Sequence, residues 1–269
     1  MEKYSITIPK DDSSERWIEA LEEFISMTEP EWLQGMKGAS AKTIAAIKKC
    51  YDLNGDGKHL PVDYEIFLRR WGGNSYVSFP DKPICRFNTP LLYHEYFPIA
   101  AMEYYCEKWG AEHGMYQAFA VFVDEYGGGP ILTFDDNNMN VWCRPIYPEH
   151  PIASDFRHCF CCSVFLDFGI RQFTQRIGFV VDRSPDSYGE AQTADIIALL
   201  KKQGFIKQWF STELDQIWIN SKVCCVISRE ESDELHVFLY YNDMKDCEDI
   251  VYLLRSANWI KYEFWGNFP

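Results

Sequence analysis

The stretch "DLNGDGKHLPVDYEIFLRRWGG", Asp52 to Gly73, decides how the N-terminal half of the chain is interpreted. Its second half predicts a helix that begins after Leu60. Pro61 suits the first helical position, where its missing N–H costs nothing. Gly72 is expected to end the helix in a left-handed conformation. The apolar residues of one helical face follow at the required spacing, and they are Tyr64, Phe67, Leu68 and Trp71.

The first half of the stretch spells D-x-N-x-D-G, the opening of an EF-hand calcium loop, and it also resembles a dockerin repeat. Its ligands would be Asp52, Asn54, Asp56 and Asp63. EF-hands and dockerins work as pairs of loops, and the sequence contains no second loop. Asn-Gly-Asp-Gly is also typical of a tight turn between two helices. We therefore favour the turn, and a calcium-dependent binding module stays the alternative.

Helices are predicted on one side of this stretch and strands on the other. Residues 15–27 and 40–53 have apolar residues at helical spacing. Beyond residue 75 we expect short strands or buried segments joined by turns, at residues 76–79, 118–124, 130–136, 140–146 and 158–168.

A second pattern of elements begins near Arg176. It predicts helices at 191–205 and 247–259 among strands at 177–182, 207–211, 216–221, 222–229, 234–241 and 260–265. The expected domains are an N-terminal helical extension (1–39), a central domain (40–176) and a small α+β region (177–269). The predicted fold class is α+β, with N-terminal helices packed on a central, mostly antiparallel sheet, followed by the smaller α+β region.

The stretch "IAAIKKCYDLNGDGKHLPVDYEIFLRRWGG" resembles the SUKH superfamily, the Smi/Knr-like domain. The family pattern has a helix, a short loop and Leu-Pro-x-Asp-Tyr-x-x-Phe-Leu followed by Gly-Gly. A strand, a glycine-rich turn and a strand that ends in Asp come later, and "FAVFVDEYGGGPILTFD" fits them. The matching residues, called the motif residues below, are Leu60, Pro61, Asp63, Tyr64, Phe67, Leu68, Gly72, Gly73, Gly127, Gly128 and Asp135.

The resemblance extends over residues 40–173 and implies a domain without catalytic residues. Many bacterial SUKH proteins look like immunity proteins, which neutralise a toxin of a polymorphic toxin system by direct contact. Fungal relatives are linked to regulation of cell-wall glucan synthesis. The resemblance therefore favours a non-enzymatic bacterial immunity protein, with a regulator or scaffold of the Smi/Knr type as an alternative.

Charge and cysteine content narrow the partners and the compartment. The formal charge of -14 argues against nucleic-acid binding and is compatible with a basic protein partner, such as a basic toxin domain. No signal peptide is visible at the start, and no apolar run reaches transmembrane length. Ten cysteines are therefore expected to be reduced thiols in a cytoplasmic protein without membrane contact.

Catalytic and metal-binding patterns were sought separately. No phosphate-binding, zinc-protease or nucleophile-elbow motif occurs in the sequence. "HCFCC" (158–162) groups soft ligands, but its apolar neighbours favour buried strand cysteines. Consecutive carboxylates point apart and are interpreted as solvated charges, at Glu22/Glu23, Asp135/Asp136 and Glu230/Glu231. No enzyme, cofactor or metal is predicted.

Overall fold

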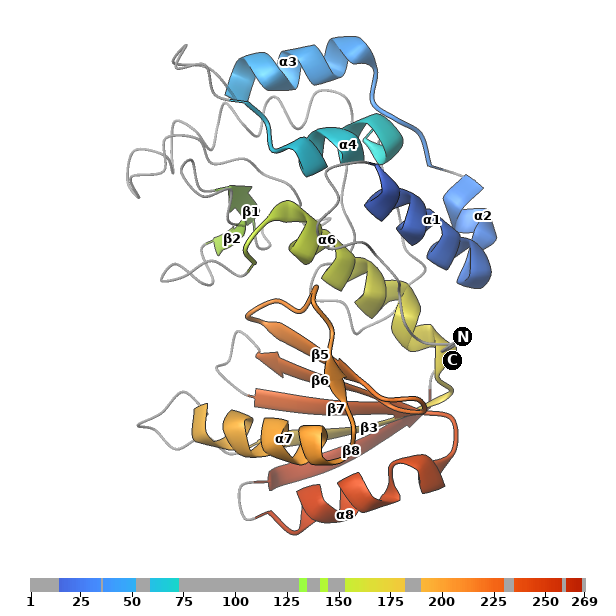
Figure 1. Ribbon diagram of the computed structural model, residues 1–269, viewed down its shortest axis with the longest axis vertical. Helices are drawn as coiled ribbons and strands as arrows, with labels where there is room; N and C mark the ends of the chain where they lie inside the picture. Colours follow the sequence, from blue (N-terminus) through green and yellow to red (C-terminus); the bar gives the residue numbers. More distant parts are fainter. Residues whose placement is uncertain are drawn as a thin grey trace. The chain divides into compact units, whose positions relative to one another are not determined.

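The computed structural model describes residues 15–34, 36–51, 59–72, 131–134, 141–144, 153–181, 190–229, 235–257 and 260–267. Figure 1 draws their helices and strands. The described residues fall into two compact units that divide between Leu166 and Asp167. The first unit is mainly helical in its described part, and the second contains a six-stranded antiparallel sheet. The predicted α+β class is confirmed.

The first unit begins with the predicted helices. The prediction for residues 15–27 corresponds to α1 (Arg16–Thr28), which a short α2 (Pro30–Gln34) follows. The prediction for residues 40–53 corresponds to α3 (Ala41–Tyr51). Further along, β1 (Ile131–Phe134) and β2 (Val141–Arg144) pair antiparallel, so both strands expected here are confirmed.

The helix predicted after Leu60 is α4 (Val62–Trp71), directly preceded by Pro61. Gly72 ends it, but the predicted left-handed conformation is wrong, because its φ is -73°. The glycine is needed for space instead, since a Cβ there would lie 2.6 Å from the carbonyl oxygen of Leu68. That carbonyl also accepts a hydrogen bond from the N–H of Ala39 at 2.8 Å. Backbone from before α3 thus helps to close the helix end.

Aromatic side chains join α4 to α1 and to α6 (Phe156–Val164). Trp17 of α1 meets Phe156 and Phe160 of α6 edge-on, with ring centroids 6.5 and 6.1 Å apart. The ring centroids of Phe67 on α4 and Phe160 are 4.9 Å apart. Edge-to-face pairs of this kind stabilise a core beyond the area that they bury. The fully buried aromatic residues of this core include Trp17, Tyr64, Phe67, Trp71, Phe156, Phe160 and Phe165.

The strand expected at residues 158–168 is wrong. This segment is helical, and α6 continues into a π-helical turn (Phe165–Gly169) and a 3-10 turn (Ile170–Gln172). Nearly every residue of α6 is buried, so the sequence shows no polar face from which a helical period could be read. Asp155 supplies the start signal, because its carboxylate accepts a hydrogen bond from the N–H of His158 at 2.8 Å.

The second unit follows the predicted order of elements closely. Its strands are β3 (Gln175–Val181), β4 (Ile206–Lys207), β5 (Asp215–Ile219), β6 (Cys224–Arg229), β7 (Leu235–Tyr241) and β8 (Ile260–Asn267). Its helices are α7 (Glu190–Lys202) and α8 (Glu248–Arg255). The strand predicted at 207–211 is shorter than expected, since β4 ends at Lys207. The sheet order is β4-β5-β6-β7-β3-β8, and every neighbouring pair is antiparallel.

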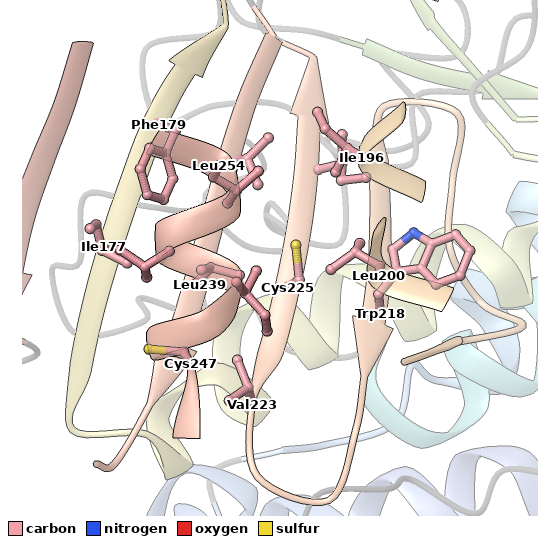
Figure 2. Packing of buried hydrophobic residues seen from close by; sticks show 14 of the residues in the cluster. Ile177, Phe179, Ile196, Leu200, Trp218, Val223, Cys225, Leu239, Cys247 and Leu254 are labelled. Atoms are coloured by element: carbon pink, nitrogen blue, oxygen red, sulfur yellow. The ribbon is translucent and has the colours of Figure 1, made fainter. Parts of the chain in front are cut away.

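One face of this sheet forms the core of the unit with α7 and α8 (Figures 1 and 2). Alternate residues of the strands point toward the helices, as Ile177 and Phe179 of β3 do in Figure 2. The helices contribute Ile196, Leu200 and Leu254 to the same cluster. The period-2 pattern of the strands and the helical period of α7 and α8 therefore agree on one buried layer.

On the opposite face, a glycine makes room for an aromatic ring. Gly178 of β3 lies beside Phe264 of β8, and a Cβ on Gly178 would lie 2.4 Å from the Cζ of that ring. The guanidinium carbon of Arg176 lies 5.8 Å from the ring centroids of both Phe264 and Phe238. The ring of Phe264 thus covers the glycine and fixes β8 to β3.

We expect Gly178→Ala to lower the free energy of unfolding by about 1 to 2 kcal/mol, because the added methyl group displaces the Phe264 ring. In a Phe264→Ala background the same substitution should be neutral or slightly stabilising, because the ring is gone and alanine restricts the unfolded chain. Urea unfolding of the two single variants and the double variant measures this coupling. If the effects of Gly178→Ala and Phe264→Ala on the free energy of unfolding were additive, the Phe264 ring would not be what restricts residue 178 to glycine.

Candidate functional site

Six of the motif residues with a described environment belong to the hydrophobic core or border it. Leu60, Tyr64, Phe67 and Leu68 are buried, as is Pro61 at the helix start. Gly72 ends α4. Gly73, Gly127, Gly128 and Asp135 lie outside the described residues. In the described part, the motif therefore supplies packing.

Asp63 is the polar member of the motif, and it holds Arg157 of α6. The Nε and Nη2 atoms of Arg157 donate to the two carboxylate oxygens of Asp63, at 3.2 and 2.7 Å. The Arg157 side chain is only 8% exposed, and its guanidinium carbon lies 5.6 Å from the Trp17 ring centroid. A buried bidentate pair of this kind is costly to break from one side, because it leaves a buried charge without its counterion.

The same contact bears on the calcium alternative. Asp63 would be the last ligand of the loop, but both of its oxygens accept hydrogen bonds from a guanidinium. A calcium ion would have to compete with this cation for the carboxylate. Asp52, Asn54 and Asp56 lie outside the described residues. Among the residues that the structure describes, no group of three or more His, Cys, Asp or Glu residues could hold a metal ion.

Glu22 is a structural residue, which corrects its interpretation as a solvated charge. Its carboxylate accepts hydrogen bonds from Arg70 and from the indole N–H of Trp71, the latter at 3.0 Å. The hydrogen bond to Glu22 raises the pKa of the Arg70 guanidinium. Glu23, by contrast, is exposed as expected. The other two carboxylate pairs lie outside the described residues.

A cluster at the start of α6 contains Ser154, Asp155 and His158, the residue types of a hydrolase triad. A triad needs the acid and the hydroxyl on opposite nitrogens of the imidazole. Here Asp155 and Ser154 both reach Nδ1 of His158, at 2.8 and 3.1 Å. Burial alone would raise the pKa of Asp155, but hydrogen bonds from His158 outweigh burial and lower it. The cluster is a charged helix cap and lacks an activated nucleophile.

A second polar row crosses the sheet, and the sequence analysis missed it. Asp215, Ser228 and His236 occupy directly paired positions on β5, β6 and β7, and all three are buried. The Oγ of Ser228 donates to the carboxylate of Asp215 at 2.5 Å. The hydroxyl proton thus faces the acid, whereas nucleophilic catalysis needs the imidazole between them. The signal that the sequence offered was a polar residue at or next to one end of each of these largely apolar strands.

The cysteines of "HCFCC" are buried in α6, and Cys159, Cys161 and Cys162 are free thiols. Burial raises the pKa of Cys161 well above its usual range. The thiol is therefore protonated near neutral pH, which makes it a poor nucleophile and a poor metal ligand. These residues act as small hydrophobic side chains, as expected, although they lie on a helix and not on a strand.

Two surfaces remain as candidates for contact with other molecules. The first is called the acidic face here and consists of three exposed glutamates, Glu19 and Glu23 on α1 and Glu31 on the short helix α2 that follows α1. The two residues on α1 are four apart and share the side opposite the buried Trp17. This surface carries negative charge where a basic partner could approach.

The second surface is the β8 edge, formed by Tyr262, Glu263 and Trp265 of β8 with Arg255 of α8. Tyr262 and Trp265 are 49% and 51% exposed, which is unusual for large aromatic side chains. Arg255 donates to both carboxylate oxygens of Glu263, at 2.9 and 3.0 Å, and lies over the Trp265 ring. These hydrogen bonds lower the pKa of Glu263.

Comparison of the chain with models of protein families, with curated proteins and with solved structures finds no match. None of the helices in the described stretches has both the length and the apolar composition that a bilayer span requires.

We expect Asp63→Ala to lower the free energy of unfolding by about 3 kcal/mol, because it leaves the buried Arg157 without a counterion. Glu65→Ala on the same helix is the matched control. Its partner Lys48 is 47% exposed, and the loss should stay below about 1 kcal/mol. Chemical denaturation of both variants measures the two losses in the free energy of unfolding. Equal losses would show that the Asp63–Arg157 pair is no stronger than a surface ion pair.

Proposed function

We propose that this chain is a non-enzymatic protein-binding protein, an immunity protein of the SUKH type that neutralises a basic toxin domain by direct contact. The observation that carries the proposal is the use of the motif residues in α4. Leu60, Tyr64, Phe67 and Leu68 build the core that joins α4 to α1 and α6. Motif residues whose side chains pack in the core are more typical of a scaffold that presents a binding surface than of a catalytic site.

Charge supports a basic partner. The chain carries a formal charge of -14, and the acidic face shows three exposed carboxylates on α1 and α2. Opposite charge on the partner would raise the rate of association and favour this face over others. Many nucleases that act as toxins are basic, because they bind a phosphate backbone. An acidic protein that covers such a surface would compete with the nucleic acid.

The first test looks for a toxin domain encoded beside the gene of this chain and co-expresses the two; a gene with no such neighbour would contradict the immunity role. Growth should be restored, and calorimetry of the purified proteins should give a saturable complex. Glu23→Lys/Glu31→Lys should weaken binding about ten-fold or more, because it places like charge against a basic partner. Rescue without a measurable complex would contradict direct contact.

The matched control is Asp195→Lys/Glu213→Lys, which changes two exposed acidic residues of the second unit. Each double variant exchanges two negative for two positive charges, so both change the net charge by +4, from -14 to -10. The control should bind within about two-fold of the wild type if the acidic face is the docking surface. Equal weakening by both variants would mean that only the net charge matters, and no binding by the wild type would contradict the proposed function.

A further inference from the structure

The second unit leaves one long strand at the edge of its sheet. β8 pairs with β3 from Gln175↔Asn267 to Val181↔Ile260, and it is the last strand in the order of the sheet (Figure 1). Within the described residues, no strand pairs with the other side of β8. The opposite edge is formed by β4, which is only two residues long. A long edge strand offers a row of backbone donors and acceptors to another chain.

Two large aromatic side chains of β8 lie exposed along this edge. Tyr262 and Trp265 are about half exposed, and they point to opposite faces of the sheet because their positions differ by an odd number. Glu263 is already paired with Arg255, and the other charged residue of β8, Lys261, precedes residues 262–266. An added strand would therefore be flanked by an aromatic ring on each face. Exposed aromatic residues on an edge that pairs with no described strand favour association.

We propose that β8 pairs antiparallel with β8 of a second copy of this chain, in the register that places Phe264 opposite Phe264. The two six-stranded sheets then form one continuous sheet about a two-fold axis. Tyr262 lies opposite Gly266 of the second copy, and Glu263 lies opposite its Trp265.

Two registers centred on earlier residues of β8 are less favourable. A centre at Glu263 would place two carboxylates directly opposite each other, which destabilises a strand pair. A centre at Tyr262 would use Lys261, where the pairing of β8 with β3 is irregular between Val180 and Val181. The register centred on Phe264 uses only residues 262–266, where the pairing is regular.

In this register an aromatic ring meets a glycine and a cation. Gly266 has no side chain, and the guanidinium of Arg176 lies beside it, with Nη2 3.2 Å from the position of an added Cβ. The guanidinium thus covers Gly266, and the ring of Tyr262 from the second copy would lie against the guanidinium. The electron-rich ring face and the positive charge are complementary. The two-fold axis makes the same contact twice.

On the other face of the new strand pair, positive and negative charges balance. On this face, Glu263 of each copy lies opposite Trp265 of the other copy. Each Glu263 carries its own Arg255, so two carboxylates and two guanidinium groups lie near the axis. The net charge of each chain opposes association over longer distances, and salt at about 0.15 M screens this repulsion beyond roughly 8 Å.

Sedimentation of the purified full-length chain between about 1 and 100 μM tests the proposal, because moderate affinities fall in this range. The mass should rise with concentration to that of two chains. Tyr262→Lys and Trp265→Lys should each raise the dissociation constant about ten-fold or more, since charge on an edge blocks strand pairing. Ile206→Lys is the matched control, because Ile206 is 70% exposed on β4 at the opposite edge. It should leave the dimer unchanged.

The register has its own readout. Tyr262→Cys/Gly266→Cys should form a disulfide-linked dimer under mild oxidation, because these positions face each other across the axis at a distance that a disulfide spans. Tyr262→Cys alone should not, and the wild type is the background control. A dimer linked by the single variant would contradict the register. A chain that stays monomeric throughout would overturn the proposal and leave the edge to a strand of another protein.

This dimer goes beyond the proposed function and does not depend on it. The sedimentation test uses the chain alone, so its outcome is independent of any toxin. Glu23→Lys/Glu31→Lys, which should lose toxin binding, should dimerise normally because both residues belong to the first unit. Loss of the dimer in this variant would contradict the assignment of the interface to β8.

Discussion

The buried pair of Asp63 and Arg157 is the constraint on which the first unit depends. The two residues are 94 positions apart, and their contact fixes α6 against α4 in one orientation. Apolar packing alone tolerates sliding of one helix along another, whereas a bidentate ion pair has one geometry. With α4 and α6 held in this orientation, the aromatic rings of Trp17, Phe67 and Phe160 pack together between the helices.

Sequence patterns predicted most of the second unit and the N-terminal helices. Strands such as β7 alternate residues between two faces, and α4 begins after a proline and ends at a glycine, as expected. α6 escaped because its side chains are buried on all sides, so no polar stripe marks its period. Local signals fail where the environment does not vary around a helix.

The candidate surfaces were less accessible to sequence reasoning. The acidic residues could be counted, but which of them face solvent depends on packing, as Glu22 and Glu23 show. Asp63 fitted both a calcium loop and a helix motif, and only its contact with an arginine far along the chain distinguishes its surroundings. The exposed edge at β8 depends on the order of the strands, which local periodicity does not encode.

The position of β3 in the sheet has a consequence for folding. β3 is the first strand of its sheet in the chain, yet both of its neighbours, β7 and β8, come later than every other strand. During synthesis both edges therefore stay open until residue 241 has been made, and one of them until residue 267. Such non-local pairing slows folding and exposes the apolar faces of β3 for longer before its partners arrive.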